Sequence, residues 1–166
     1  ADLMTAIYAA NTQGLLKSAA FPTRMAGNIG LPILSQTPLS AGGVYVLELS
    51  SYQIDLTHSL ACDAATLINL SPDHLDRYDG YPGYIASKAR LFDDDTRHVY
   101  EAVLAKRGAD VVHLAETANL GDQLEWPSLQ GPHNLQNVAV ATKLVESLGL
   151  TEAQWRPALK TFKGLA

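Results

Sequence analysis

The sequence has 166 residues, which is long enough for one domain with a buried core. Its 17 acidic and 12 basic residues give a formal net charge of -5, which argues against a nucleic-acid partner. The single cysteine, Cys62, excludes an intrachain disulfide and fits a reducing compartment. No apolar run approaches the ~20 residues of a membrane span, and no signal-peptide pattern opens the sequence. We therefore expect a soluble, cytoplasmic protein with no membrane partner.

The first half of the sequence alternates between helical and extended patterns. Alanine- and leucine-rich stretches predict a helix over residues 3–10 and the end of a second helix over 15–19. Extended segments are predicted from Pro22 to Met25, over 44–47 and over 64–70, and a short helix over 52–60. A further helix over 81–92 places Tyr84 and Lys88, four residues apart, on one face.

The second half carries the clearest helical pattern. A strand is predicted over 111–114, and apolar residues recurring every three or four positions predict an amphipathic helix over 134–148. Gly149 is a natural stop for it, and Thr151 with Gln154 predicts a capping box for a last helix. Pro157 is late for that helix and predicts a kink or a delayed start. Alternating strands and helices predict an α/β fold, with a mostly parallel sheet and helices on both faces.

Polar residues follow three of the extended segments. Asn28 follows the first, Glu48 and Ser50 follow the second, and Asp73 and His74 follow the third. Because the carboxyl ends of parallel strands meet at one edge of a sheet, we expect these side chains to gather there.

Each of these residues also has an ordinary structural explanation. Asn28 lies near glycines and suits a left-handed turn. Ser50 can cap the next helix, and the sequence around it does not form the G-x-S-x-G elbow of a hydrolase serine. Asp73 can cap a helix, with His74 in its first turn. Their joint occurrence at strand ends is what favours a site.

A divalent cation is the first chemical hypothesis for that edge. Glu48 and His74 can both bind a metal, although a carboxylate suits magnesium and a histidine suits zinc or manganese better. Asp76 can be a third ligand, or it can pair locally with Arg77. Lys88 is either a solvated lysine or a group near the metal, where it can neutralise phosphate or carry a carbamate.

Two asparagines open the helix predicted over 134–148. Asn134 and Asn137 are three residues apart and therefore share one face of its first turn. Asn134 alone is an ordinary N-cap. Together, the two amides can also read a base edge or hold a phosphate at the helix N-terminus.

Several strings of residues, in the same order, resemble motifs of the Mur ligase family, and of its D-glutamate-adding type in particular. The match includes the spacing from Tyr84 to Lys88, and the strings are Gly27-Asn28-Ile29-Gly30-Leu31-Pro32, Glu48-Leu49-Ser50-Ser51-Tyr52-Gln53, Asp73-His74-Leu75-Asp76-Arg77-Tyr78, Gly131-Pro132-His133-Asn134-Leu135-Gln136-Asn137 and Thr161-Phe162-Lys163-Gly164-Leu165. The resemblance implies the family's central ATP-binding domain, whose fold is like that of the P-loop NTPases.

The resemblance implies an ATP-dependent ligase of peptidoglycan synthesis. ATP phosphorylates the carboxylate of UDP-N-acetylmuramoyl-L-alanine, and the amine of D-glutamate attacks the acyl phosphate. The implied metal ligands are Glu48, His74 and a carbamylated Lys88, which hold two magnesium ions, and His74 and Lys88 are the implied catalytic residues. Asn28 and Ser50 are implied near the muramoyl substrate.

The remaining implied contacts concern the nucleotide and the oligomeric state. The resemblance places Asn134 and Asn137 near ATP. We also expect a monomer that binds small molecules and no nucleic acid.

One part of the family pattern is absent from the sequence. No Gly-rich loop ending in Gly-Lys-Ser or Gly-Lys-Thr, whose amides and lysine cradle ATP phosphates, precedes Asn28. We expect that residues 1–166 are an incomplete central domain, with a P-loop stretch missing near Gln13 and Gly14 and a second shortening after Phe92. The N- and C-terminal domains of the family are also absent, so we expect this fragment alone to be inactive.

Two other functions compete with the ligase hypothesis. One is a non-catalytic module that binds a nucleotide or a UDP-sugar and has lost its P-loop. The other is a metal-dependent phosphohydrolase built on Glu48, His74 and Asp76. That hydrolase predicts activity without D-glutamate, whereas a ligase requires it.

Overall fold

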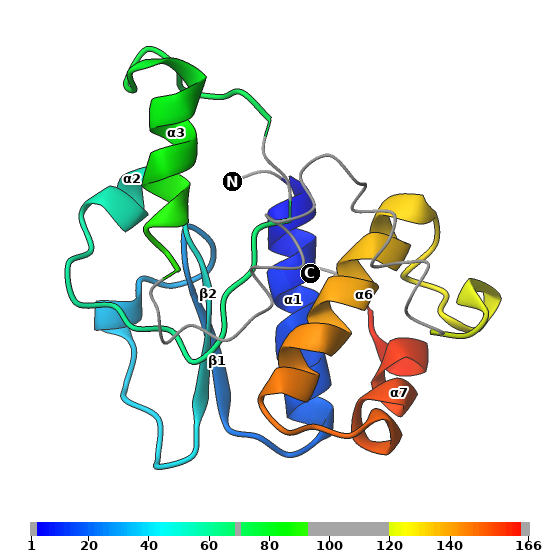
Figure 1. Ribbon diagram of the computed structural model, residues 1–166. Coiled ribbons are helices and arrows are strands. Elements are labelled where there is room, and N and C mark those ends of the chain that lie inside the picture. The colour runs from blue at the N-terminus through cyan, green and yellow to red at the C-terminus, as the bar shows by residue number, and fades with distance from the viewer. Residues whose placement is uncertain (1–2, 69–70, 93–119, 164–166) are drawn as a thin grey trace.

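The computed structural model describes residues 3–68, 71–92 and 120–163 (Figure 1). The elements in chain order are α1 (Leu3–Ser18), β1 (Thr23–Gly27), η1 (Ile33–Ser35), β2 (Val44–Glu48), α2 (Ser51–Asp55), α3 (Gly80–Ala89), η2 (Gln123–Glu125), α6 (Pro132–Ser147) and α7 (Glu152–Thr161). The strand predicted over 111–114 and the shortening predicted after Phe92 lie outside the described residues. The described elements make an α/β fold.

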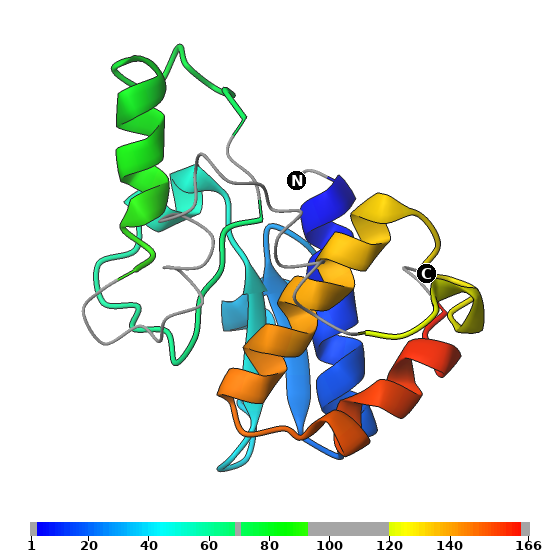
Figure 2. The same cartoon turned by 45° about the vertical axis from the view of Figure 1, so that its right-hand side comes forward.

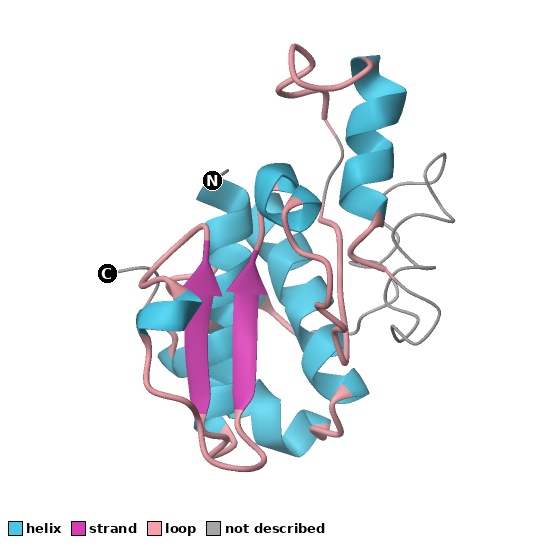
Figure 3. Ribbon diagram, turned by 90° about the vertical axis from the view of Figure 1, so that its left-hand side faces the viewer, coloured by secondary structure: helices cyan, strands magenta, loops and turns pink. Residues whose placement is uncertain are grey.

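The sheet of the described residues consists of β1 and β2, which pair in parallel (Figure 3). The register runs from Thr23 opposite Val44 to Gly27 opposite Glu48. Both strands confirm predicted extended segments. The strand predicted over 64–70 was wrong for its described part, because residues 65–68 form no strand and Ala64 makes only an isolated bridge. Two consecutive alanines there weaken the preference for a strand.

An apolar core lies between the sheet and the helices. Helices α1 and α6 lie side by side against one face of the strands, and α7 packs against α1 (Figures 1 and 2). The largest apolar side chains that are almost completely buried in this core are Trp126, Leu16, Leu129, Leu159, Val138, Val140 and Val145. The stripe predicted over 134–148 is therefore confirmed as the buried face of α6.

The opposite face of the sheet has a different cover. Among the described residues it carries η1 and its flanking loop instead of a layer of long helices (Figure 3). The Gln36 amide fastens this loop by donating to the Met25 carbonyl at 3.1 Å and to the Leu31 carbonyl at 2.7 Å. Among the described residues, long helices therefore cover one face of the sheet, and helices on the other face stay a prediction.

Helix α1 is continuous through Gln13 and Gly14, where the sequence pattern had predicted two separate helices. Gly14 allows close packing and does not interrupt the helix. A Cβ at Gly14 would lie 3.1 Å from the Phe162 ring, so the missing side chain lets the end of α7 approach α1. The absence of a P-loop string remains a fact of the sequence, and the missing stretch near this point remains a prediction.

The two C-terminal helices begin and end largely as predicted. Helix α6 has Pro132 in its first turn, and Gly149 follows it with a φ of 94°. Thr151 and Gln154 form the predicted capping box, in which the Thr151 N–H donates to the Gln154 Oε1 at 2.8 Å. Pro157 lies inside α7, so the helix starts without delay.

Helices α2 and α3 are both shorter than the predictions of 52–60 and 81–92. They lie beyond the carboxyl end of β2, apart from the α1–α6 pair (Figures 1 and 2). No helix in the described residues combines the length and the apolar character that crossing a membrane requires.

Candidate functional site

A cavity of about 500 Å³ runs along β2 and past its carboxyl end. Residues from α1, β2, α2, α3 and α6 line it, together with residues 60–68. The polar residues predicted for the edge of the sheet, together with Lys88 of α3, all line this one cavity: Asn28, Glu48, Ser50, Asp73, His74 and Lys88. The predicted gathering of these residues is therefore confirmed.

The ends of β1 and β2 approach so closely that only glycine fits at position 27. Gly27 has a φ of 109°, and a Cβ there would lie 2.0 Å from the Glu48 carbonyl oxygen. The Asn28 N–H donates to the same carbonyl at 2.7 Å. The left-handed conformation thus belongs to Gly27, and its assignment to Asn28 was wrong. The side chain of Asn28 is left exposed at the cavity.

Glu48 ends β2 with a side chain that points into the protein. The residue is only 6% exposed, and it lines the cavity. A carboxylate in such a position loses hydration, which favours the approach of a cation. Glu48 is the carboxylate that the sequence predicted at the strand end, and its burial is a finding of the structure.

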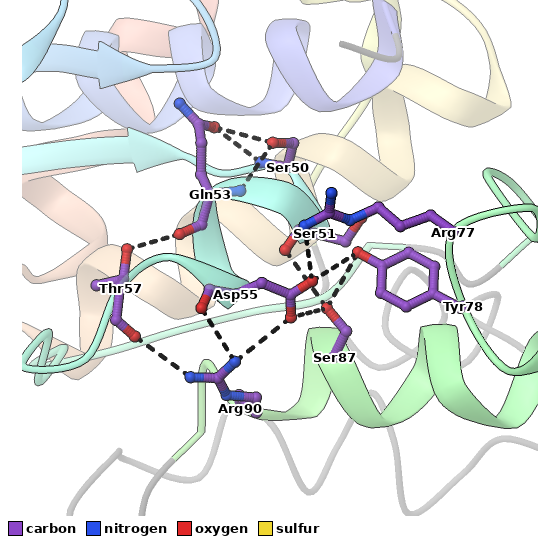
Figure 4. Close-up of polar contacts among 9 residues, drawn as sticks. All are labelled: Ser50, Ser51, Gln53, Asp55, Thr57, Arg77, Tyr78, Ser87 and Arg90. Carbon is purple, nitrogen blue, oxygen red and sulfur yellow. Dashed lines mark hydrogen bonds and ion pairs between the residues drawn. The ribbon is translucent and has the colours of Figure 1, made fainter.

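Ser50 caps α2. Its hydroxyl accepts from the Gln53 N–H at 3.3 Å, and the Gln53 Oε1 accepts from the Ser50 N–H at 3.0 Å, which completes a capping box (Figure 4). The ordinary structural explanation of Ser50 is therefore confirmed. Because the residue also lines the cavity, this cap fixes the hydroxyl in one orientation at the cavity wall.

His74 lies in a turn and not in a helix. Its φ is 51°, and its N–H donates to the Asp73 carboxylate at 2.8 Å. Its ring lies 5.0 Å from that of Tyr52, and its side chain is 49% exposed. Asp73 therefore holds a turn, and the prediction that it caps a helix was wrong, because α3 begins only at Gly80.

Arg77 pairs with a different acid from the one predicted. Its Nη2 lies 3.7 Å from Asp55 Oδ2, and its guanidinium stacks on the Tyr52 ring at 4.4 Å. The local pair with Asp76 was therefore wrong. Within the described ranges, no group of three His, Cys, Asp or Glu residues is placed to hold a metal ion. The triad of Glu48, His74 and Asp76 thus gains no support.

Lys88 and Tyr84 share one face of α3, as predicted. The Lys88 Nζ lies 5.2 Å from the centre of the Tyr84 ring, and the lysine is half-buried at the cavity. Burial first, and then the negative charge of Asp73, raises the pKa of Tyr84 above its ordinary value. The phenol therefore stays neutral at physiological pH and offers Lys88 an aromatic face.

Asn134 and Asn137 lie in the first half of α6 and outside the cavity lining. The Asn134 Nδ2 donates to the Gln130 carbonyl at 2.9 Å, and Gly131 is the N-cap, so the N-cap explanation of Asn134 was wrong. Asn137 is 1% exposed, and neither amide atom of its side chain has a hydrogen-bond partner among the described residues. A buried amide without partners is unusual and calls for a ligand or another explanation.

Sequence reasoning missed a polar cluster beside the cavity. The Asp55 carboxylate, at the end of α2, accepts hydrogen bonds from Ser87 and Tyr78 and lies beside Arg90 and Arg77 (Figure 4). These partners are 22 to 35 residues away in the sequence, as their numbers show, so no local spacing connects them. Only the folded chain brings them together.

Comparison with known proteins decides the family. Residues 2–119 match the model of the Mur ligase middle domain. The chain belongs to the Mur ligase family. The family's central domain is thus confirmed, whereas the complete P-loop NTPase-like fold is not established by the two strands described here.

Individual members of the Mur ligase family are also similar to this chain in sequence. Proteins named UDP-N-acetylmuramoylalanine--D-glutamate ligase from Novosphingobium aromaticivorans, Sphingopyxis alaskensis and Zymomonas mobilis are 57%, 49% and 47% identical to it. These matches cover 89%, 91% and 91% of the chain, and 37% of each relative. The chain therefore spans somewhat over a third of the length of these relatives.

Proposed function

We propose that the protein containing this chain is an ATP-dependent ligase that joins D-glutamate to UDP-N-acetylmuramoyl-L-alanine in peptidoglycan synthesis. Membership of the Mur ligase family and the names of the similar relatives support this activity. The observation that carries the proposal is the cavity, because residues from four separate motifs of the D-glutamate-adding type line it together. ATP, D-glutamate and the UDP-linked substrate are the proposed small-molecule partners of a cytoplasmic monomer.

The donor atoms that line the cavity suit a magnesium ion. Glu48 supplies a buried carboxylate, which is the type of ligand that magnesium prefers. His74 lines the same cavity, although its half-exposed ring contacts Tyr52. Since magnesium keeps several waters and binds phosphate oxygens, a carboxylate and one further ligand fit it. We propose Glu48 and His74 as ligands of one ion; when bound, the metal neutralises charge on the transferred phosphoryl group.

Lys88 is the proposed source of a second metal ligand. The ammonium group first loses a proton; the neutral Nζ then forms a bond to the carbon of CO₂ and loses a second proton, which leaves an anionic carbamate. The amine is half-buried at the cavity and lies over the neutral Tyr84 ring, which holds the side chain in place. Lys88 and His74 are thereby the proposed catalytic residues.

Asn28 and Ser50 are proposed to contact the muramoyl substrate. The Asn28 amide is exposed at the cavity and can both donate and accept hydrogen bonds. The Ser50 hydroxyl is held by its capping box, so it meets the substrate with little loss of side-chain freedom. Both residues follow strand ends, where ligands of α/β sheets bind.

Asn134 and Asn137 are proposed to contact the nucleotide. The supporting observation is Asn137, because leaving a buried amide without partners costs roughly 1–3 kcal/mol. A purine edge presents the donors and acceptors that such an amide lacks. Asn134 shares its helix face and has its Nδ2 already engaged with Gln130, which leaves the amide oxygen for the ligand.

The activity is tested by phosphate release from ATP in the full-length polypeptide that carries this sequence. We expect release only when both UDP-N-acetylmuramoyl-L-alanine and D-glutamate are present, with L-glutamate as the matched control. Phosphate release without any glutamate would indicate a phosphohydrolase. Binding of the UDP-linked substrate with no release would indicate a non-catalytic module. The intact mass of the polypeptide shows whether a P-loop stretch is present.

The role of Lys88 has its own test. We expect Lys88→Ala to abolish D-glutamate-dependent release and an added short-chain carboxylic acid to restore part of it. Lys143→Ala, on the exposed side of α6, is the matched control and should retain activity. Full activity of Lys88→Ala would exclude the carbamate.

A further inference from the structure

Asp55 connects two helices and a turn through a single carboxylate. It is the last residue of α2, and its Oδ1 accepts from the Ser87 hydroxyl of α3 at 2.7 Å. Its Oδ2 accepts from the Tyr78 hydroxyl of the turn at 3.0 Å (Figure 4). Both carboxylate oxygens are therefore engaged with side chains from segments distant in the sequence.

Two arginines complete the cluster, which we name the Asp55 clasp: Asp55, Arg77, Tyr78, Ser87 and Arg90. Arg90 lies 3.4 Å from the Asp55 carboxylate and donates to its backbone carbonyl at 3.3 Å. Both guanidinium groups are nearly half-exposed, so solvent screens their attraction. The hydroxyl donors, which bond to a carboxylate only 22% exposed, are the stronger contacts.

The apolar contact of α3 with the other described residues is small. Only Tyr84 and Ser87 of its residues are buried. Ser87 is one of the clasp residues, and it immediately precedes Lys88. The position of α3, and with it the backbone of Lys88, therefore depends on this polar contact in addition to the packing of Tyr84.

The clasp also reaches the other side of the cavity. Arg77 stacks on the Tyr52 ring at 4.4 Å, and that ring contacts His74 at 5.0 Å. Displacing the clasp would thus shift both the turn that holds His74 and the helix that holds Lys88. One carboxylate connects the supports of both proposed catalytic residues.

We propose that Asp55 is a positioning residue, whose carboxylate holds α3 and the His74 turn so that the Lys88 amine stays at the cavity wall. The expected effect on turnover rests on the proposed function, whereas the expected effect on the position of α3 rests on the geometry alone. A misplacement of about 1 Å at a reacting group can lower a rate by up to roughly 100-fold. Removing the charge of Asp55 should therefore reduce turnover without removing any group that touches substrate.

The test compares Asp55→Asn with Glu152→Gln in the full-length polypeptide. Asparagine keeps the shape of Asp55 and removes its charge, whereas Glu152 makes an exposed ion pair with Arg156 on α7 and serves as the matched control. We expect Asp55→Asn to lower kcat roughly 10- to 100-fold, with the KM for ATP unchanged within about twofold. Ser87→Ala, which favours the helix, should lower kcat less, and the double variant should fall short of the product of the two effects.

A second measurement does not depend on turnover. The labelling rate of Lys88 by an amine reagent in CO₂-free buffer is compared with that of Lys143 on α6, whose side chain is 47% exposed. We expect Asp55→Asn to raise the rate at Lys88 several-fold, with no change at Lys143 or in hydrogen exchange along α6.

The outcomes separate this inference from the proposed function. If the wild-type polypeptide releases no phosphate but Asp55→Asn still exposes Lys88, the ligase assignment fails and the clasp stands. A labelling rate of Lys88 that is unchanged in both Asp55→Asn and Ser87→Ala would overturn the proposed positioning role of the clasp. So would equal loss of protection in α3 and α6, since Asp55 would then support the whole fold instead of positioning one helix.

Discussion

Two regions of this Mur ligase chain are held together by different forces. The apolar region, made of α1, residues 120–131, α6 and α7, encloses tightly buried aliphatic and tryptophan side chains. The polar region, made of α2, the turn over 71–79 and α3, depends on hydrogen bonds to one carboxylate. Apolar burial is strong but non-directional, whereas hydrogen bonds fix distances and angles. Stability and the placement of the site residues therefore come from separate parts of the chain.

The largest expected effect breaks the apolar region. Trp126 is 1% exposed, and Trp126→Ala should lower the free energy of unfolding by about 3–5 kcal/mol. Leu124→Ala, two residues earlier, removes a side chain that is 80% exposed and should change it by less than about 0.5 kcal/mol. Urea unfolding followed by circular dichroism measures both. Equal effects would mean that Trp126 is not part of the core.

The next largest effect concerns the close approach of β1 and β2 at Gly27, which lies between the apolar and the polar region. We expect Gly27→Ala to cost about 2–5 kcal/mol, since a left-handed alanine costs roughly 1–2 and overpacking roughly 1–3. Gly42 also has a positive φ, but its missing Cβ has open space. Gly42→Ala should therefore show only the conformational cost. Similar losses in the two variants, measured by urea unfolding, would argue against the contact with Glu48.

A smaller effect tests polar contacts inside the apolar region. Thr151→Ala removes one side of the capping box of α7 and should cost about 1 kcal/mol. Lys163→Ala, an exposed position beyond the helix, is the control. Thermal unfolding measures both. A loss as large as that of Trp126→Ala would show that caps, and not burial, dominate this region.

The smallest expected effect is a local loss of stability. Acidic pH should weaken the polar region before it weakens the apolar region. The hydrogen bond from Ser87 in the first place, then the Tyr78 hydroxyl and the two arginines, lower the pKa of Asp55 below its ordinary value of 3.8. A lowered pKa stabilises the fold above the ordinary value, and this contribution is lost as the pH falls through the folded-state pKa.

Hydrogen exchange at neutral and strongly acidic pH measures the difference between the regions. After correction for the intrinsic exchange rates, α3 should lose protection at acidic pH before α6 does. Simultaneous loss of protection in both helices would contradict a separate polar region, and Asp55→Asn should remove the pH dependence of α3.

The parts of the fold that the sequence predicted are those with local signals. The apolar spacing of α6, the capping box at Thr151 and the two strands each lie within a few neighbouring residues. The gathering of Glu48 and Lys88 was also predictable, from strand ends and from motif resemblance.

The failures have physical causes. Gly14 was interpreted as a break because a sequence does not show the Phe162 ring that needs its missing side chain. The Asp55 clasp was missed because its hydrogen bonds join residues 23 and 32 positions apart, where no periodicity exists. The predicted Asp76–Arg77 pair failed because Asp55 and the Tyr52 ring together offer Arg77 a better site than its neighbour does.

The placement of the aromatic residues has an optical consequence. Both tryptophans of the sequence, Trp126 and Trp155, are buried in the apolar region, while Tyr78 belongs to the clasp and its ring contacts those of Tyr52 and Tyr84 beside it. Tryptophan fluorescence therefore follows the melting of the apolar region and is blind to the release of α3. The ultraviolet absorbance of the tyrosines, three of which lie in or beside the clasp, changes when the clasp opens, so absorbance detects an event that tryptophan fluorescence does not.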